Sequence, residues 1–374
     1  MSSPLAIQTL PFAAPANAEV GTQPVTDLAA NDPYIQPGPS DPAPALAVPD
    51  PKSKAIRLVK TQDLSRDEWL EVRKQGIGSS DAATAVGLNP YQSALELWMV
   101  KTGRDANLPK VDPEDDTSPM YWGTLLEHIV AAHYTRRTGN RVRRVNAVLQ
   151  HPQHPWMLAN IDREVTGSSE VQILECKTAG INGAKLWKNG VPDYVQLQVM
   201  HQLAVTGKDV ADVAVLIGGQ DLQIHRIYRD EALIEQLIGL EAQFWECVEL
   251  DIPPKADGSE SAQTALRALY PGDGSESVID LKGDLEMNAA FSDLLSLRQH
   301  LTQTEKYESE IRQRIQQKMG DCSKALFDEG QISFKRSKDS EVFDADKLKT
   351  TDPALYAQFL KTREGSRRFV IQGK

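Results

Sequence analysis

The order of β-type and helical segments between residues 142 and 228 constrains the fold of this chain more than any other feature of its sequence. Short segments rich in Val, Ile, Leu and Thr, separated by turn residues, are typical of β-strands. The sequence predicts strands at 142–150, 157–165, 171–178, 211–217 and 223–228. The segment 194–206 has helical spacing and separates the third strand from the fourth. These elements predict an α/β (α+β) core in which helices flank a mixed sheet.

Further helices are expected on both sides of these strands, at 65–73, 82–86, 93–98, 123–138 and 231–250. Apolar residues over 287–315 recur with coiled-coil-like spacing, which Thr304 and Glu308 interrupt. A β-hairpin at 324–328 and 331–335, a helix at 345–360 and a strand at 367–371 complete the expected elements. They predict a second, smaller α+β module after the core.

Composition divides the chain into four parts. The first 51 residues contain no Lys or Arg and hold 11 of the 22 prolines, which is typical of a disordered segment. We expect a Pro/Ala-rich tail at 1–54, a core at 55–256, a linker at 257–284, and a C-terminal helix with a small α+β module at 285–374. A secretory signal is not expected, because prolines interrupt the apolar stretch and no basic residue precedes it.

Charge and cysteine content narrow the class of protein. A net charge of -11 disfavours a broadly basic surface for nucleic acid but is compatible with a local basic channel. The three cysteines lie far apart and form neither a disulfide framework nor a CxxC metal site, which favours a reducing compartment. No apolar run in the sequence approaches the roughly 18 residues of a membrane helix. The densest basic cluster, which forms either a solvated face or a track for a DNA backbone, is Arg136, Arg137, Arg141, Arg143 and Arg144.

The most informative residues are Asp162 and, thirteen positions later, Glu175-Cys176-Lys177. Because side chains alternate along a strand, Glu175 and Lys177 project from one face and Cys176 from the other. A hairpin around 166–169 would bring Asp162 to the face of Glu175. Two carboxylates and an ammonium group would then share one site, which suits Mg²⁺ with oxygen ligands.

Phosphodiester cleavage requires this combination, because a metal neutralises the negative charge of the transition state while Lys177 orients or helps to deprotonate the attacking water. Glu127, on the preceding helix, is the expected additional ligand. It lies off the centre of the predicted buried stripe, which is Leu126, Ile129, Val130 and His133. The pattern is also short enough to occur by chance as a solvated strand edge, so the pattern alone leaves both interpretations open.

Two other groups of polar residues accompany this pattern. Gln198, His201 and Gln202 share one side of the helix at 194–206. For Gln198 an active-site role is favoured, whereas His201 fits a satisfied buried imidazole equally well. Arg73 with Ser79 and Ser80 offers a guanidinium fork and hydroxyl donors for a terminal phosphate, although an arginine at a helix end is also a common solvated charge.

Several ordered motifs resemble the YqaJ viral recombinase family, the group that includes phage lambda exonuclease. The matching segments are Trp69-Leu70-Glu71-Val72-Arg73, Gly78-Ser79-Ser80-Asp81-Ala82-Ala83, Trp122-Gly123-Thr124-Leu125-Leu126-Glu127, Leu158-Ala159-Asn160-Ile161-Asp162, Leu174-Glu175-Cys176-Lys177, and 194–207 with Gln198. The resemblance covers roughly half the chain. It leaves the tail and the C-terminal module without a functional interpretation.

The resemblance implies a restriction-endonuclease-like PD-(D/E)XK core with an exonuclease activity. The implied enzyme requires Mg²⁺, with Mn²⁺ as the alternative, and digests linear duplex DNA from a 5′-phosphorylated end, leaving a 3′ single strand for recombination. The expected catalytic residues are Glu127, Asp162, Glu175, Lys177 and Gln198. The expected metal group is Glu127, Asp162, Glu175 and Cys176. The expected substrate-binding residues are Arg73, Ser79, Ser80 and Asn160, of which Arg73 and Ser80 would grip the 5′ phosphate.

The same resemblance implies the partners and the setting. They are double-stranded DNA ends, a single-strand annealing protein and further copies of the chain in a ring-shaped trimer, in the cytoplasm of a bacterial host of a phage or prophage. Two alternatives stay open. One is an endonuclease or nickase with the same core, since nothing in the sequence proves that a DNA end is required. The other is a catalytically idle DNA-binding or assembly protein whose 287–315 helix contacts partners.

Overall fold

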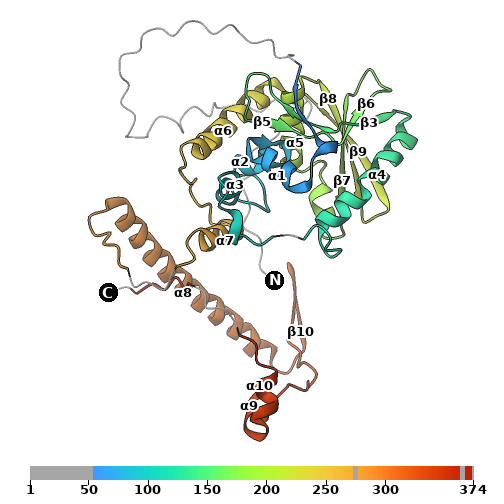
Figure 1. Cartoon of the computed structure of the whole chain (residues 1–374). Coiled ribbons are helices and arrows are strands. Elements are labelled where there is room, and N and C mark those ends of the chain that lie inside the picture. Colours follow the sequence, from blue (N-terminus) through green and yellow to red (C-terminus); the bar gives the residue numbers. More distant parts are fainter. Residues whose placement is uncertain (1–53, 111, 273–276, 363–366, 373–374) are drawn as a thin grey trace, which may run out of the picture. The chain divides into compact units, whose positions relative to one another are not determined.

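The structure is a computed structural model that describes residues 54–110, 112–272, 277–362 and 367–372 (Figure 1). The expected tail at 1–54 lies outside the described residues apart from its last position. The described chain is mixed α/β, with two sheets in the core and a two-stranded hairpin in the C-terminal segment. The expected fold class is therefore confirmed.

The larger core sheet has five strands in the order β3-β6-β7-β8-β9. The strands are β3 (Val142–Arg144), β6 (Arg163–Val165), β7 (Ile173–Ala179), β8 (Val210–Ile217) and β9 (Asp221–Tyr228). Only the β7–β8 pair is parallel, and helix α5 (Asp193–Thr206) forms the crossover between these two strands. The β6–β7 hairpin pairs Arg163 with Leu174, which places Asp162 next to the strand that carries Glu175.

The second core sheet has four strands in the order β1-β4-β5-β2. The strands are β1 (Ile56–Lys60), β4 (Ala147–Gln150), β5 (Met157–Ala159) and β2 (Ile77–Gly78). Two expected strands were wrong as single units, since 142–150 is divided into β3 and β4, and 157–165 into β5 and β6. At each division the chain leaves one sheet and enters the other, a change that alternating hydrophobicity does not reveal. Asp162 lies at one of these transitions.

The N-terminal helices form largely as expected. Helix α1 (Arg66–Lys74) begins with a capping box, in which Ser65 Oγ accepts the Glu68 N–H and the Glu68 carboxylate accepts the Ser65 N–H. Helices α2 (Ala82–Ala85), α3 (Ala94–Lys101) and α6 (Glu231–Glu249) also match. Four short 3-10 turns accompany the helices. The turn η1 (Thr61–Asp63) precedes α1, η2 (Ser79–Asp81) precedes α2, η3 (Asp105–Asn107) follows α3, and η4 (Gly183–Trp187) precedes α5.

Helix α4 (Pro119–Thr138) packs against β7, β8 and β9 and corrects the expected buried stripe. Its buried residues are Val130, Ala131 and Tyr134, whereas Ile129 is exposed. Glu127 is three, four and seven positions before these buried residues and therefore lies on the packed face. The expected stripe was right at Val130 and wrong at Ile129 and His133, because the helix turns Ala131 and Tyr134 toward the sheet instead.

The two faces of β7 point into different parts of the core. Ile173 joins the apolar cluster that contains Val199 and Leu203 of α5. Leu174 joins the cluster that contains Val130 and Tyr134 of α4. The alternation of side chains along β7 thus assigns Glu175 and Lys177 to the α5 side and Cys176 to the α4 side.

The expected linker at 257–284 is wrong over its first half. Helix α7 (Glu260–Leu269) forms within it and packs against α3. Ser261 Oγ accepts the N–H of Ser93, and Ala265 is fully buried in the cluster that contains Trp98. The core therefore continues to at least Leu269.

The C-terminal segment contains helix α8 (Leu285–Met319), the hairpin of β10 (Lys324–Phe327) and β11 (Gly330–Ser333), and helices α9 (Ala345–Thr351) and α10 (Pro353–Gln358). The expected helix at 345–360 is divided because Pro353 starts a new helix. The strand expected at 367–371 was wrong, since these residues are described and form none. Among the described residues, no helix is both long and apolar enough to cross a membrane.

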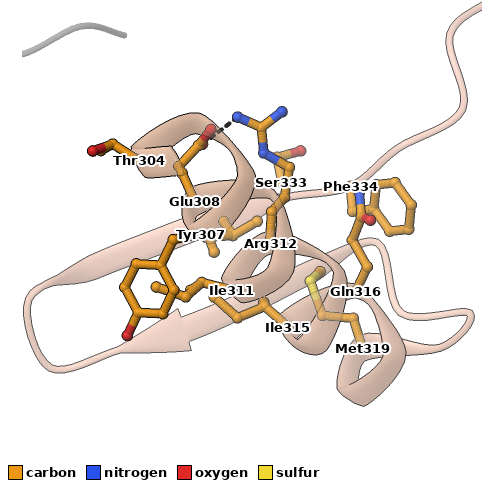
Figure 2. Close-up of a pocket in the computed structure, with 11 residues that line it drawn as sticks. Thr304, Tyr307, Glu308, Ile311, Arg312, Ile315, Gln316, Met319, Ser333 and Phe334 are labelled. Atoms are coloured by element: carbon orange, nitrogen blue, oxygen red, sulfur yellow. Dashed lines mark hydrogen bonds and ion pairs between the residues drawn. The ribbon is translucent and has the colours of Figure 1, made fainter. Parts of the chain in front are cut away.

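A groove of about 500 Å³ lies between the second half of α8 and the hairpin (Figure 2). Tyr307, Ile311 and Ile315 line it from the helix and Phe334 from the chain after β11, and the Glu308–Arg312 ion pair lies on the helix beside them. None of the expected catalytic residues lines this groove. All the expected catalytic residues lie in the core instead.

Candidate active site

The centre of the site is a buried carboxylate paired with a lysine on β7. Glu175 is only 2% exposed. Its Oε1 atom lies 2.7 Å from Lys177 Nζ. The two residues share one face of the strand, as the Glu-x-Lys spacing predicts. An ion pair in this position is expensive to desolvate and requires further partners.

Gln198 supplies these partners from α5. Its Nε2 donates to Glu175 Oε1 at 2.6 Å, and its Oε1 accepts from Lys177 Nζ at 2.8 Å. The amide thus bridges the carboxylate and the ammonium group. The structure brings Glu175, Lys177 and Gln198 together as the sequence predicts.

Gln202 is a site residue that the sequence-based list does not include, although its place on the polar side of the helix was visible. It is fully buried, and its Nε2 donates to Glu175 Oε2 at 2.7 Å and to the Asn160 carbonyl at 3.2 Å. Both neighbours are acceptors, so the amide group must turn its nitrogen toward them. Gln202 Oε1 is consequently a buried acceptor without a hydrogen-bond partner among the described residues. Gln198 and Gln202 together fix both oxygens of Glu175.

Asp162 adjoins this cluster at the entrance to β6. Its Oδ2 accepts the backbone N–H of Cys176 at 2.8 Å. Burial and, second to it, the Glu175 carboxylate raise the pKa of Asp162 to about 8, although Lys177 and the Cys176 N–H lower it. The Asp162 and Glu175 carboxylates thus lie close enough to repel each other, and Lys177 only partly offsets this repulsion. A bound cation would offset the rest.

Lys177 keeps its proton in this environment. Burial alone would lower the pKa of Lys177, but the Glu175 and Asp162 carboxylates outweigh burial and raise it. The side chain is therefore an ammonium group that can orient a water or a phosphate oxygen and offset negative charge. The raised pKa disfavours a role for Lys177 as a free base.

Glu127 does not join Glu175 and Lys177. It projects from α4, on the opposite face of the sheet, and forms an ion pair with Arg163 Nη1. Arg144 Nη2 lies 3.8 Å from the same Glu127 oxygen. The sequence could not reveal this arrangement, because Arg163 follows Asp162 directly and has no separate motif. Glu127 remains close enough to add to the raised pKa of Asp162.

Two other expected residues, Cys176 and Asn160, contact the site through backbone atoms. Cys176 contributes its backbone N–H to Asp162, while burial and the carboxylates of Asp162 and Glu175 raise the pKa of its thiol, so a thiolate ligand is disfavoured. Asn160 contributes its carbonyl to Gln202, and its side-chain amide donates to the Ala147 carbonyl at 3.4 Å.

The donor set fits a divalent cation bound mainly through Asp162 and Glu175. No group of three His, Cys, Asp or Glu side chains within the described ranges is arranged to hold one ion. Mg²⁺, however, is commonly held by one or two carboxylates, with waters and substrate oxygens completing its shell. The raised pKa of Asp162 marks the same position. The expected metal group of Glu127, Asp162, Glu175 and Cys176 stays a prediction, and within it Asp162 and Glu175 are the two carboxylates that interact most strongly.

A second polar cluster forms around Asp81, between α1, η2 and α3. Its carboxylate binds Arg73 Nη2 at 2.8 Å and Lys101 Nζ at 2.7 Å. Arg73 Nη2 also donates to Ser80 Oγ at 2.7 Å. Burial alone would raise the pKa of Asp81, but the two cations outweigh it and hold the pKa well below its usual range. Two cations against one carboxylate leave a net positive site.

Lys101 is the second residue that sequence analysis missed. Its side chain is 2% exposed and its ammonium group also donates to the Arg73 carbonyl at 2.8 Å. Gly78 lies against the same cluster, where an added Cβ would stand 3.3 Å from Arg73 Nη2. The expected Arg73 and Ser80 pair is thus assembled and charged, while Ser79 is buried beside it.

His201 and two arginines of the basic cluster have structural partners. His201 Nδ1 lies 2.8 Å from Glu241 Oε1 and His201 Nε2 lies 2.9 Å from the Leu158 carbonyl, all within the buried core. The interpretation of His201 as a satisfied buried imidazole is thus favoured over an active-site role. In the basic cluster, Arg143 pairs with Glu164 and Arg137 donates to the Leu222 carbonyl.

The fold and the site define an α/β protein with a carboxylate, lysine and amide centre next to a separate cationic site. Residues 68–209 match the family model described as the YqaJ-like viral recombinase domain. The uncharacterized protein YqaJ of Bacillus subtilis (strain 168) is 34% identical over 323 residues, which cover 85% of this chain and 98% of that protein. The chain belongs to the YqaJ-like viral recombinase family.

Two exonucleases are among the solved structures that match part of this chain. The crystal structure of the alkaline exonuclease LHK-Exo from Laribacter hongkongensis matches with 23% identity and a TM-score of 0.40, covering 50% of this chain and 94% of that one. The phage related exonuclease from Haemophilus somnus 129PT matches with 10% identity and a TM-score of 0.35, covering 47% and 96%.

Proposed function

We propose that this chain is a divalent-metal-dependent deoxyribonuclease that acts on the ends of linear duplex DNA. The observation that carries the proposal is the convergence of Asp162, Glu175, Lys177 and Gln198 in one site. A cation bound by the two carboxylates would polarise a phosphodiester and supply a nucleophilic water when bound. Family membership supports a nuclease role within recombination.

The side chains of the chain itself perform distinct tasks in this reaction. Lys177 holds its ammonium group beside Glu175, where it can offset charge on a phosphate oxygen or orient a water. Gln198 and Gln202 hold the carboxylate of Glu175 in one orientation. Buried donors in fixed positions require little reorganisation when charge develops in the transition state.

We further propose that digestion starts at a 5′-phosphorylated end. The positive cluster of Arg73 and Lys101 on Asp81, with the Ser80 hydroxyl, supports binding of a terminal 5′ phosphate. Digestion from such an end would leave a 3′ single strand for recombination.

We further propose Mg²⁺ as the metal, assembly with other copies of the chain, and transfer of the product strand to an annealing protein. Cys176, Cys247 and Cys322 are free, which supports a reducing cytoplasm as the setting.

Three DNA substrates test the proposal. Purified protein with Mg²⁺ is incubated with linear duplex bearing 5′ phosphates, with the same duplex bearing 5′ hydroxyls, and with closed circular duplex, beside a Glu175→Ala control. Digestion mainly of the phosphorylated linear DNA is expected. Cutting of the circle would instead assign the site to an endonuclease. Absence of any Glu175-dependent cutting would leave a DNA-binding or assembly role.

A further inference from the structure

An exposed tyrosine lies beside the candidate active site without a role in the chemistry described above. Tyr91 is 65% exposed, and its ring meets Tyr194 edge to face with centroids 5.8 Å apart and planes at 87°. Aromatic rings favour edge-to-face and offset-stacked contacts with other rings, and tyrosine is common where one side of a contact is apolar and the other is wet. This ring offers its free face to solvent.

The segment that carries Tyr91 is fixed. The Tyr91 N–H donates to Asn89 Oδ1 at 2.9 Å, and Asn89 Nδ2 donates to Thr84 Oγ1 at 2.7 Å. Thr84 is fully buried in α2, and Pro90 restricts the backbone between Asn89 and Tyr91. A ring held in this way loses little conformational entropy when a ligand covers it.

Tyr194 connects this ring to the catalytic cluster. It lies in the first turn of α5, four positions before Gln198, so both side chains lie on one side of the helix. Lys177 lies close enough for the two groups to interact electrostatically. The aromatic pair therefore borders Lys177 and Gln198.

The loop that carries Tyr91 also borders the cationic cluster. It joins α2 to α3, the helix that supplies Lys101, and α2 directly follows the turn with Ser80 and Asp81. Both α2 and this turn pack against α5. Tyr91 thus belongs to the structural unit that links the proposed site for the terminal phosphate to the proposed site of cleavage.

When a strand is shortened from its phosphorylated end, the terminal phosphate and the phosphate to be cleaved flank one nucleoside. We propose that the Tyr91 ring, supported by Tyr194, is the stacking surface for the base of this terminal nucleoside. Every base has an aromatic face, so such a contact tolerates any sequence and is typically worth about 1–3 kcal/mol. The inference rests on the proposed nuclease function and deepens it by naming the group that receives the unpaired base.

Binding of DNA that lacks only the terminal base tests the inference. The full chain in Ca²⁺ is titrated with 5′-phosphorylated linear duplex that ends either in a normal nucleotide or in an abasic one. The wild type should bind the normal end about fivefold to a hundredfold tighter. Tyr91→Ala should lose this difference, and Tyr91→Phe should keep it because the ring remains. Tyr228→Ala removes a tyrosine that is equally exposed, at 64%, on β9, and should also keep it.

Several results would overturn the inference. Tyr91→Ala could retain the full difference between the two ends, or Tyr91→Phe could lose it, which would indicate hydrogen bonding by the hydroxyl instead of stacking. Cleavage of linear DNA by the wild type in Mg²⁺ is measured in parallel. If the wild type cleaves but Tyr91→Ala behaves like wild type, only the stacking surface is refuted. If the wild type neither binds nor cleaves DNA, the proposed function fails and the stacking surface fails with it.

Discussion

Replacing Asp162 by Asn should abolish cleavage while stabilising the metal-free protein. The asparagine keeps an oxygen that can accept the Cys176 N–H, so the contact with β7 is retained. It removes a carboxyl group whose ionised form is disfavoured by burial and by the nearby Glu175 carboxylate, the two main causes that raise the pKa of Asp162 to about 8. Loss of a metal ligand and gain of stability are therefore expected from the same substitution.

The sign and size of this effect follow from proton linkage. The unfolded chain releases the Asp162 proton near the ordinary pKa of 3.8, whereas the folded chain keeps it to about pH 8, so stability falls as the pH rises between these values. At pH 7 the difference of roughly three pH units sets a ceiling of about 4 kcal/mol. Because Asp162 keeps partial contact with solvent, we expect Asp162→Asn to be more stable by only about 1–2 kcal/mol.

Urea unfolding at pH 7, in EDTA and in Mg²⁺, measures both parts of this prediction. Mg²⁺ should stabilise the wild type by mass action and leave Asp162→Asn nearly unchanged. Asp116→Asn, at an exposed position, serves as the control for a general change in charge. A less stable Asp162→Asn protein in EDTA, or an equal gain from Mg²⁺ in both proteins, would refute the reasoning.

Three further predictions concern other parts of the core. Arg73→Ala should reduce digestion of 5′-phosphorylated ends by about tenfold to a hundredfold, the range for a lost charge-assisted hydrogen bond, and spare 5′-hydroxyl ends; equal losses on both ends in a rate assay would remove the phosphate site. Gln202→Leu should raise the Mg²⁺ concentration for half-maximal activity about tenfold, because one oxygen of Glu175 loses its donor, and an unchanged metal titration would contradict this role. The Glu241 carboxylate outweighs burial and raises the pKa of His201, so the pair stabilises the fold fully below about pH 6.5 and loses this contribution as the pH rises through the raised value. Urea unfolding from pH 6 to 9 should show a decline for the wild type that is shallower in His201→Gln, and parallel curves would exclude the pair as its source.

The sequence predicts the local elements of this core better than their grouping into sheets. The capping box at Ser65 and the alternation around Glu175 depend on neighbouring residues and appear as expected. The division of 157–165 between two sheets depends on which distant strand each half meets, and local patterning has no access to that choice. The helix within 257–284 was missed for a similar reason, because its buried face is narrow and only contact with α3 defines it.

In the candidate site, too, the sequence predicts what depends on local spacing and misses what depends on contacts between distant segments. The spacing of Glu175 and Lys177 was sufficient to place both groups on one face, and Gln198 could be chosen because it lies on the following helix. Lys101 could not be identified, since its sequence context is an apolar helix and only the fold brings its ammonium group to Asp81. The ion pair of Arg163 with Glu127 could not be identified either, because Arg163 directly follows Asp162 and only the fold brings it to α4.

The hydrogen bonds around Glu175 explain why Asp162, and not Glu175, should respond to metal. Glu175 forms an ion pair with the ammonium group of Lys177 and accepts amide donors from Gln198 and Gln202, so its charge is compensated without a metal ion. Asp162 receives one backbone N–H and no cationic side chain in the hydrogen bonds described for it. Asp162 would therefore contribute most to holding a divalent ion, since the ion would stabilise its ionised form, and Glu175 is already oriented as the second carboxylate. Gln198 and Gln202 thus fix the orientation of the Glu175 carboxylate, whereas the ionisation of Asp162 would depend on whether a metal ion is bound.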